Sequence, residues 1–195
     1  MTTVRLEAFS DAVIAIIITI MVLELKVPHG THIKDLAPLL PVFLSYIVSF
    51  LYVGIYWNNH HHLLKTCKEV TGSILWANLH LLFWLSLLPF AAGWLGENHY
   101  ASAPTALYAC VLLMAGAAYY FLQQAIMRAQ GGRSILKRAI GKDWKAKLSL
   151  LLYVVALFAT LCAPGIAQAL LVVGGLLWLV PDRRIEKGLA TVHPQ

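Results

Sequence analysis

Near the start of the chain, residues 5–11, Arg-Leu-Glu-Ala-Phe-Ser-Asp, run directly into the apolar residues 12–23. This junction puts the carboxylate of Asp11 inside a segment that otherwise predicts a membrane-spanning helix. A charged side chain in hydrocarbon costs about 3 kcal/mol or more unless it has a partner, so such a residue usually serves a function. Either Asp11 has such a role, or residues 5–11 are only the hydrated cytosolic end of the helix.

The composition indicates an all-α, polytopic membrane protein. Of the 195 residues, 59% are hydrophobic and 12% are charged, whereas soluble domains have about 45–50% apolar and about 25% charged residues. A helix needs about 20 mostly apolar residues to cross the hydrocarbon core, and six segments meet this requirement. Pro89 is expected to bend the outer end of the third segment. We expect one six-helix membrane domain over residues 1–195, with spans at about residues 4–27, 35–62, 71–94, 104–128, 142–162 and 165–180.

The net charge of +6 follows from 15 Lys and Arg residues against 9 Asp and Glu residues. Apart from Lys26 and Lys34, every Lys and Arg lies on the side of the predicted membrane that holds both termini. Positive residues accumulate on the cytosolic side of membrane proteins, so both termini are predicted to be cytosolic. The dense run at residues 128–147 can also contact anionic lipid headgroups. Topology and lipid contact explain the basic charge, and nucleic acid is not an expected partner.

One face of the first predicted helix carries branched apolar residues and one hydroxyl. Asp11 lies about 130° from the centre of this face, so it would point back into its own subunit if the face lined a pore. Arg5 is about 120° from Asp11, too far round the helix for an i,i+4 pair, and Asp11 must find donors on other helices. Such a face fits either packing against another helix or the lining of a pore. Its residues are Ala12, Ile16, Thr19, Ile20 and Leu23.

The second predicted helix offers donors for that carboxylate at residues 57–62, Trp-Asn-Asn-His-His-His, and the third adds Asn78. Indole, amide and imidazole groups can hold a buried carboxylate and keep it ionised. We expect His60 and His62 to cap the helix at the membrane interface. For His61, which lies four residues after the tryptophan and so on the same helix face, both roles stay open.

Several functional classes are not expected. Consecutive helical residues diverge by about 100°, so the three histidines cannot converge on one metal ion. The sequence has no HExxH motif, Walker loop or nucleophile elbow, so we expect neither an enzyme nor a cofactor. It has no Gly-Tyr-Gly filter either, which excludes a channel of the pore-loop kind. Cys67, Cys110 and Cys162 have neither metal-ligand nor disulfide spacing.

The pattern Arg-x-x-x-Phe-Ser-Asp at residues 5–11, which opens the first of the six predicted spans, closely resembles the signature of the transmembrane protein 175 family of potassium channels. The resemblance extends over nearly the whole chain and depends most on the first helix, where the motif is specific. Further similarity to family members lies in residues 9–16, 23–28, 57, 60–62 and 78–90.

The resemblance implies a channel in which the first helix of each repeat lines the pore. A chain with one repeat is similar to the prokaryotic members, which assemble as homotetramers. Ile16 matches their hydrophobic constriction, Ile20 and Leu23 match further apolar rings, and Thr19 matches the hydroxyl layer tied to potassium preference. The motif is also implied to join a polar network with the second and third helices, made here of Arg5, Phe9, Ser10, Asp11, Trp57, His61 and Asn78.

We therefore expect a potassium-selective cation channel of a prokaryotic plasma membrane, with potassium ions as the permeant species and the lipid bilayer as its surroundings. A proton-coupled transporter that uses Asp11 and the histidines of the second helix as a relay is the alternative. The broken midplane helices and inverted repeats of such carriers are not evident in the sequence. A membrane enzyme or haem-binding subunit built on the histidines is disfavoured by their divergence around the helix.

Overall fold

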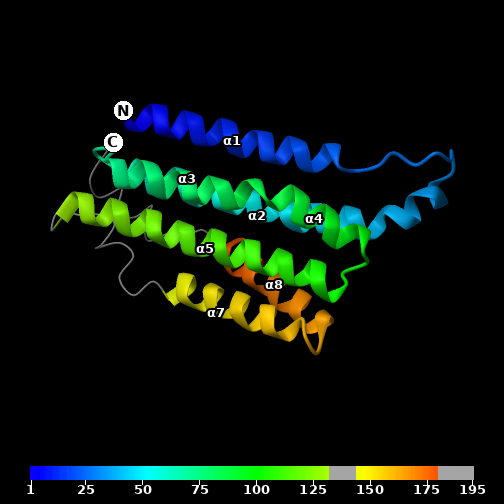
Figure 1. Cartoon of the computed structure of the whole chain (residues 1–195). Helices are drawn as coiled ribbons and strands as arrows, with labels where there is room; N and C mark the ends of the chain where they lie inside the picture. The colour runs from blue at the N-terminus through cyan, green and yellow to red at the C-terminus, as the bar shows by residue number, and fades with distance from the viewer. Residues whose placement is uncertain (132–143, 180–195) are drawn as a thin grey trace.

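The computed structural model describes residues 1–131 and 144–179, in which all regular elements are helical (Figure 1). Helix α1 (Thr3–Leu23) begins after Thr2, whose hydroxyl accepts a hydrogen bond from the backbone N–H of Arg5. It ends before the predicted residue 27, because Pro28 disfavours a helical conformation in the residue that precedes it. One face is buried at the helical spacing of three and four residues, with Leu6, Ser10, Ile14, Ile17 and Met21 on it.

Helix α2 (Leu40–Lys65) is preceded by a short 3-10 helix, η1 (Ile33–Leu39), where the sequence predicts the first turns of one α-helix. Pro38 and Pro41 explain the difference, because neither has the backbone N–H that an α-helical hydrogen bond would need at these positions. The backbone N–H of His32 donates to Asp35 Oδ2 at 2.9 Å and caps η1.

The third predicted helix is divided into α3 (Gly72–Ser86) and α4 (Leu88–Glu97). The division falls at Leu87, two residues before Pro89, where a bend is expected from the sequence. Proline lacks the N–H for the bond to the carbonyl four residues earlier, and its ring clashes with that carbonyl. The interruption is therefore the predicted bend in a sharper form.

The chain continues through α5 (Ser102–Gln130), α7 (Trp144–Ala159) and α8 (Pro164–Leu179). Of the predicted spans, residues 142–143 and 180 lie outside the described residues. Within those ranges, four segments are long and apolar enough to cross a membrane, namely Thr3–Leu23, Ile33–Lys65, Gly72–Glu97 and Ser102–Gln130. Helices α7 and α8 have 16 residues each, which gives them a length of about 24 Å.

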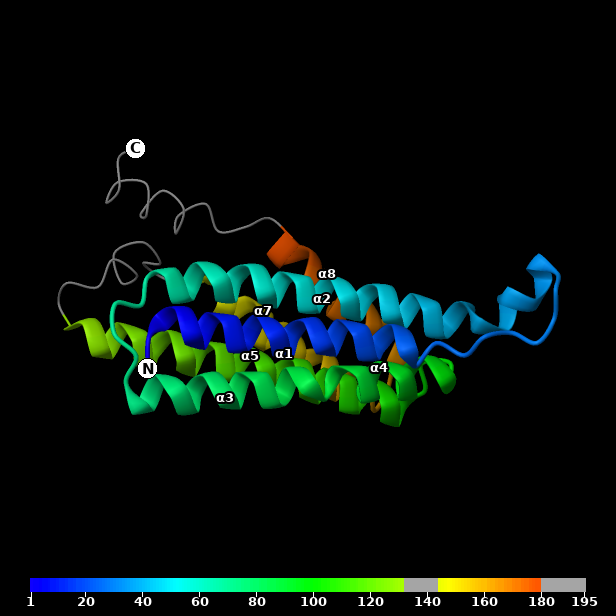
Figure 2. The same ribbon diagram turned by 90° about the horizontal axis from the view of Figure 1, so that it is seen from above.

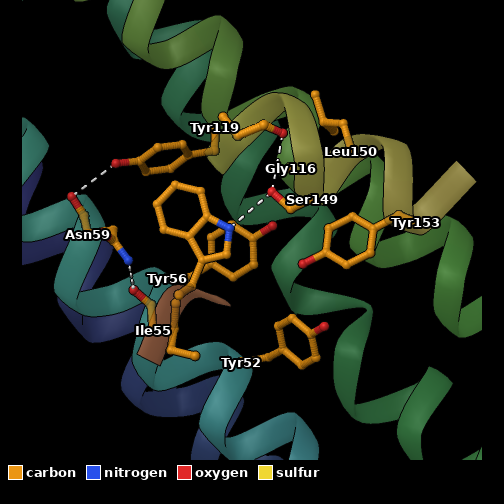
Figure 3. A pocket seen from close by; sticks show the side chains of 11 residues that line it. Tyr52, Ile55, Tyr56, Asn59, Gly116, Tyr119, Ser149, Leu150 and Tyr153 are labelled. Atoms are coloured by element: carbon orange, nitrogen blue, oxygen red, sulfur yellow. Dashed lines mark hydrogen bonds between the residues drawn. The ribbon is translucent and has the colours of Figure 1, made fainter. Parts of the chain in front are cut away.

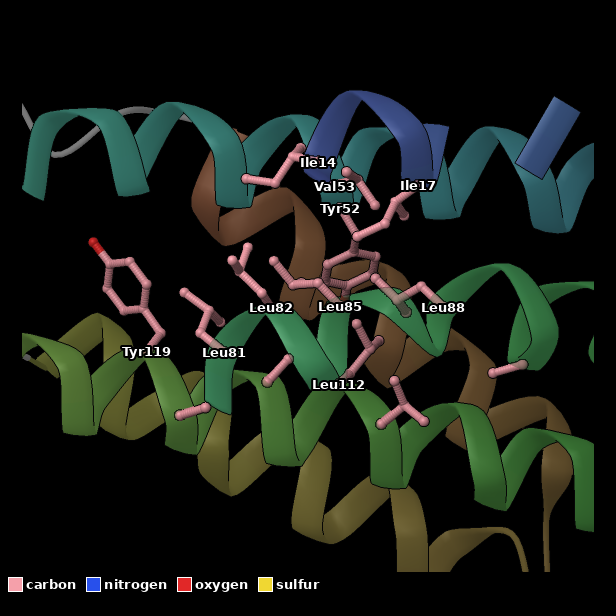
Figure 4. Packing of buried hydrophobic residues seen from close by; sticks show 14 of the residues in the cluster. Ile14, Ile17, Tyr52, Val53, Leu81, Leu82, Leu85, Leu88, Leu112 and Tyr119 are labelled. Carbon is pink, nitrogen blue, oxygen red and sulfur yellow. The ribbon is translucent and has the colours of Figure 1, made fainter. Parts of the chain in front are cut away.

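The helices run side by side along one axis, with α1 at the edge of the bundle (Figures 1 and 2). Helix α1 packs against α2, α3 and α4, while α5 packs against α3, α4, α7 and α8. The core between them is filled with apolar side chains from α1 to α5 (Figure 4). Its fully buried members include Ile14, Val53, Leu81, Leu85, Leu88 and Leu112.

Helix α4 approaches α2 very closely at Gly96. A Cβ atom built on Gly96 would lie 2.5 Å from the Cα atom of Val42 and 2.6 Å from the hydroxyl of Ser45. The Ser45 hydroxyl also donates to the carbonyl of Ala92 at 3.0 Å. Only glycine permits this approach, which fixes the outer end of α4 firmly to the start of α2.

We expect Gly96→Ala to destabilise the protein by about 1–3 kcal/mol, because backbone atoms of α2 would have to move away from the new methyl group. The matched control is Gly93→Ala in the same helix, where an added Cβ meets nothing within 4 Å. Alanine has the higher helix propensity, so the control should be neutral or stabilising. Thermal unfolding of the two variants in detergent measures the difference, and equal midpoints would contradict the close-packing argument.

Candidate functional site

The apolar face of α1 that the sequence singles out points away from the bundle. Ile16 is 58% exposed, Ile20 is 41% exposed and Leu23 is 75% exposed. Ala12 and Thr19 are exposed on the same side. Both faces of α1 are therefore largely apolar, but only one of them is covered within the subunit.

Thr19 is the hydroxyl residue on this uncovered face. Its Oγ1 donates a hydrogen bond to the carbonyl of Ala15, one turn earlier in the same helix, at 2.9 Å. A hydroxyl has one hydrogen and two lone pairs. Because the hydrogen is engaged by the helix backbone, the lone pairs of the oxygen remain available to a group that approaches the uncovered face.

The carboxylate of Asp11 lies at the side of α1 and contacts α2. Trp57 Nε1 donates to Asp11 Oδ1 at 3.0 Å. One turn closer to the N-terminus, Glu7 Oε1 lies 2.5 Å from His61 Nδ1. The rings of Trp57 and His61 are stacked, with their centroids 6.3 Å apart. Two acidic side chains of α1 are thus paired with two stacked rings of α2, and the pair formed by Glu7 was not anticipated from the sequence.

A second set of polar contacts lies deeper, between α1, α2 and α3. Asn78 Nδ2 donates to Ser10 Oγ at 2.9 Å, and Ser10 Oγ donates to the carbonyl of Leu6 at 2.8 Å. Asn78 Oδ1 lies 2.7 Å from His60 Nε2, which donates when the imidazole carries its hydrogen there. Ser10, His60 and Asn78 are all fully buried. These contacts join three helices through one chain of hydrogen bonds.

The expectation that His60 caps α2 at the interface is therefore wrong. His60 lies seven residues after Val53 and four before Leu64, both of which are fully buried. These spacings place it on the inward face of α2. The apolar periodicity of α2 indicates that His60 faces inward, but the run of three histidines favoured a cap at the interface instead.

Arg5 and Phe9 do not join the network within the subunit. Both are exposed, Phe9 by 48%, and the Arg5 side chain makes no hydrogen bond or ion pair with the residues that the structure describes. Successive helical residues turn by about 100°, which places Arg5 and Phe9 within about 20° of Ile16 on the uncovered face. The prediction that they anchor α1 to its own subunit is corrected on this point, whereas Ser10, Asp11, Trp57, His61 and Asn78 do make contacts between helices.

The outer end of the α1 segment is tied to the bundle by an ion pair. Lys26 Nζ lies 2.5 Å from Glu97 Oε1 at the end of α4. The hydrogen bond and the negative charge of Glu97, together with the charge of Glu24, raise the pKa of Lys26 above its ordinary value of 10.5. Lys26 therefore stays protonated at every physiological pH. No sequence pattern links the two residues, which are 71 positions apart.

A small cavity of about 40 Å³ lies apart from α1, between α2, α5, α7 and α8 (Figure 3). Tyr119 donates to the carbonyl of Asn59 at 3.2 Å, and Trp178 Nε1 donates to Ser149 Oγ at 3.0 Å beside it. Its size suits a few water molecules at most. Among residues 1–131 and 144–179, no three His, Cys, Asp or Glu side chains are grouped to hold a metal ion.

We expect Asn78→Ala to lower the free energy of unfolding by about 1–3 kcal/mol, because it leaves the buried Nε2 of His60 without its partner and removes the hydrogen bond that Ser10 Oγ accepts. The matched control is Asn98→Ala, since Asn98 directly follows α4, is exposed, and among the described residues its side chain bonds only to the carbonyl of Trp94 one turn earlier. Thermal unfolding in detergent should show a clear loss for the first variant and little change for the second. Equal effects would mean that the buried chain of hydrogen bonds adds no stability.

Comparisons with known proteins indicate the family of the chain. The family model described as "Endosomal/lysosomal potassium channel TMEM175" matches residues 5–89. A potassium channel of Chryseobacterium sp. (strain P1-3) is 56% identical over 189 residues, which cover 97% of this chain and 98% of that protein. The human endosomal/lysosomal proton channel TMEM175 is 33% identical over 99 residues, which cover 45% of this chain and 20% of that protein.

Among solved structures, the crystal structure of a lysosomal potassium-selective channel TMEM175 homolog from Chamaesiphon minutus superposes with a TM-score of 0.80. It is 27% identical, and the match covers 92% of this chain and 97% of the other. The similarity to the Chryseobacterium protein spans nearly the whole of both chains. The motif region, the apolar helices and the full-length similarity together identify the chain as a multi-pass membrane protein that belongs to the TMEM175 channel family.

Proposed function

We propose that four copies of this chain assemble into a potassium-selective cation channel in a prokaryotic plasma membrane, with α1 of each copy lining a central pore. Two bacterial relatives support this proposal by name, one called a potassium channel and the other a potassium-selective channel homolog. Their similarity covers more than nine-tenths of this chain in each case. The family is one of ion channels, which is not an enzyme class.

The observation that carries the proposal is the uncovered face of α1. A helix at the edge of a bundle that buries one side and leaves Ile16, Ile20 and Leu23 exposed can face either lipid or other copies of itself. Thr19 lies among them with its oxygen lone pairs free. A hydroxyl on a helix face that contacts lipid has no evident function, whereas a ring of hydroxyls around an axis can bind a cation.

In this arrangement the four Ile16 side chains form the constriction. A ring of branched apolar side chains excludes a hydrated ion because water leaves such a space, and it conducts only when the helices rotate or separate. Ile20 and Leu23 add further apolar rings. The Thr19 layer replaces part of the hydration shell of the ion. Hydroxyls coordinate a cation more weakly than a filter of backbone carbonyls, so the selectivity for potassium over sodium is modest.

The same proposal covers the topology. One membrane domain at residues 1–195 crosses the bilayer six times, with both termini in the cytosol, as the distribution of Lys and Arg indicates. Helices α7 and α8, at about 24 Å each, are shorter than the hydrocarbon core of about 30 Å and span it with the aid of flanking residues. The channel needs no cofactor, and its partners are potassium ions, lipid and three further copies.

We expect Ile16→Ala to raise the basal potassium flux of reconstituted protein by roughly tenfold, the effect of a barrier lower by about 1.4 kcal/mol. The matched control is Ile18→Ala, because Ile18 is partly buried against the bundle core. That variant should lose stability without gaining flux. The measurement is flux from potassium-loaded liposomes, and an unaltered flux in Ile16→Ala would argue strongly against the constriction.

We expect Thr19→Ala to lower the ratio of potassium to sodium permeability, because it removes the oxygen ligands next to the constriction. Thr19→Ser keeps the hydroxyl and should keep the ratio. Reversal potentials under mixed potassium and sodium measure both variants. An unchanged reversal potential in Thr19→Ala would remove the hydroxyl layer from the proposal.

The same liposomes distinguish a channel from the proton-coupled transporter considered above. Flux through a channel scales with the driving force, whereas flux through a carrier reaches a plateau. Asp11 and His61 are engaged by Trp57 and Glu7 at the side of α1, so a relay through them would require these contacts to break in each cycle. A saturating, proton-dependent flux would favour the carrier.

A further inference from the structure

The polar contacts that hold α1 are distributed very unevenly along its length. The polar contacts that α1 makes with the rest of the described structure lie in its first three turns, at Thr3, Glu7, Ser10 and Asp11. Between residues 12 and 23, the only side-chain hydrogen bond formed with a described residue is that of Thr19 to the carbonyl of Ala15 in the same helix. Among the described residues, the outer half of the pore helix is therefore held only by apolar packing, and it is the half that carries the proposed constriction.

The outer half of α1 also has room beside it. Although α1 packs against α4, a cleft of about 410 Å³ opens between them beside the outer half of α1. Ile20 and Glu24 line the cleft from the α1 side, and Pro89, Phe90 and Gly93 line it from α4. Packed interiors resist displacement because their side chains interlock, so a helix that borders such a cleft can shift at a lower cost than one that does not.

One polar contact joins the segment that follows α1 to the end of α4, the ion pair of Lys26 with Glu97, and Glu97 also lines this cleft. Lys26 lies three residues beyond the end of α1, so the pair restrains the outer end of the helix. Glu97 is held in place, because the neighbouring Gly96 packs directly on the backbone of α2 at Val42. The hydroxyl of Tyr100 adds a hydrogen bond to the carbonyl of Pro41 at 2.7 Å.

The pair itself is weak enough to be released. The side chains of Lys26 and Glu97 are 76% and 48% exposed. Exposed ion pairs contribute little net stability, because water and salt screen the charges. A contact of this kind can shift the balance between two positions of a helix without preventing the exchange between them.

We propose that the Lys26–Glu97 ion pair is an outer latch that holds the constriction half of α1 in its closed position. This inference rests on the proposed channel function. The first three turns of α1 stay fastened to α2 and α3, and the outer half moves when the latch is released. Lys26 and Glu97 act as positioning residues, since neither lies on the face that carries Ile16, Thr19 and Leu23.

Charge-reversal variants distinguish the loss of this ion pair from a direct electrostatic effect on cations near the pore mouth. The latch requires Lys26→Glu and Glu97→Lys each to raise the basal potassium flux, by roughly threefold or more, because both break the pair. An electrostatic effect on cation entry would act in opposite directions, with more flux for Lys26→Glu and less for Glu97→Lys. Opposite changes would therefore overturn the latch.

The double variant Lys26→Glu/Glu97→Lys restores the pair with its charges exchanged and should return the flux to near the wild-type level. Lys26→Arg keeps the pair and should leave the flux unchanged. The matched control is Lys34→Glu, which makes the same charge change on the outer side at an exposed residue outside the pair. If the double variant shows as high a basal potassium flux as the single variants, the proposed latch is contradicted.

The experiment uses the full chain in potassium-loaded liposomes, with Ile16→Ala as the positive control. If neither wild type nor Ile16→Ala carries potassium, the proposed function fails. If Ile16→Ala conducts and the charge reversals leave the basal flux unchanged, the channel stands and the latch fails.

Discussion

The structure depends on one constraint, which is that a polar group at membrane depth must find its partner inside the protein. Asn78 meets this requirement by bonding both Ser10 Oγ and His60 Nε2 in a fully buried chain of hydrogen bonds. The chain connects α1, α2 and α3 at a single level. It fixes not only where α1 lies but also how α1 is rotated about its own axis.

The rotation matters because the two faces of α1 have nearly the same hydrophobicity. Packing alone discriminates poorly between such faces, since Ile14 on the buried side and Ile16 on the uncovered side have identical side chains. The hydrogen bond between Ser10 and Asn78 removes this ambiguity, since rotation of the helix by one residue, about 100°, would break it and leave the buried amide nitrogen of Asn78 without its acceptor. The contact of Asp11 with Trp57 sets the same rotation from the side.

Within the bundle, α1 thus has a fastened N-terminal end and a loosely held C-terminal end. The fastened end coincides with the motif at residues 5–11, and the loose end with the residues proposed to meet the ions. Close packing of α4 on α2 at Gly96 supplies the rigid partner that the outer end would otherwise lack. A fixed base, a movable segment and a weak contact between them are the elements that a gate requires.

Hydropathy and helical periodicity are local properties of the chain, so the sequence alone indicates apolar helices, a bend near Pro89, the apolar face of α1 and the direction of Asp11 away from it. The same periodicity places Arg5 and Phe9 on the uncovered face. Which polar groups meet depends instead on how the helices pack, which buries His60 and pairs Lys26 with Glu97. The reason is distance along the chain: Ser10 and Asn78 are 68 residues apart and the Lys26 pair spans 71, so their contacts exist only once the helices have packed.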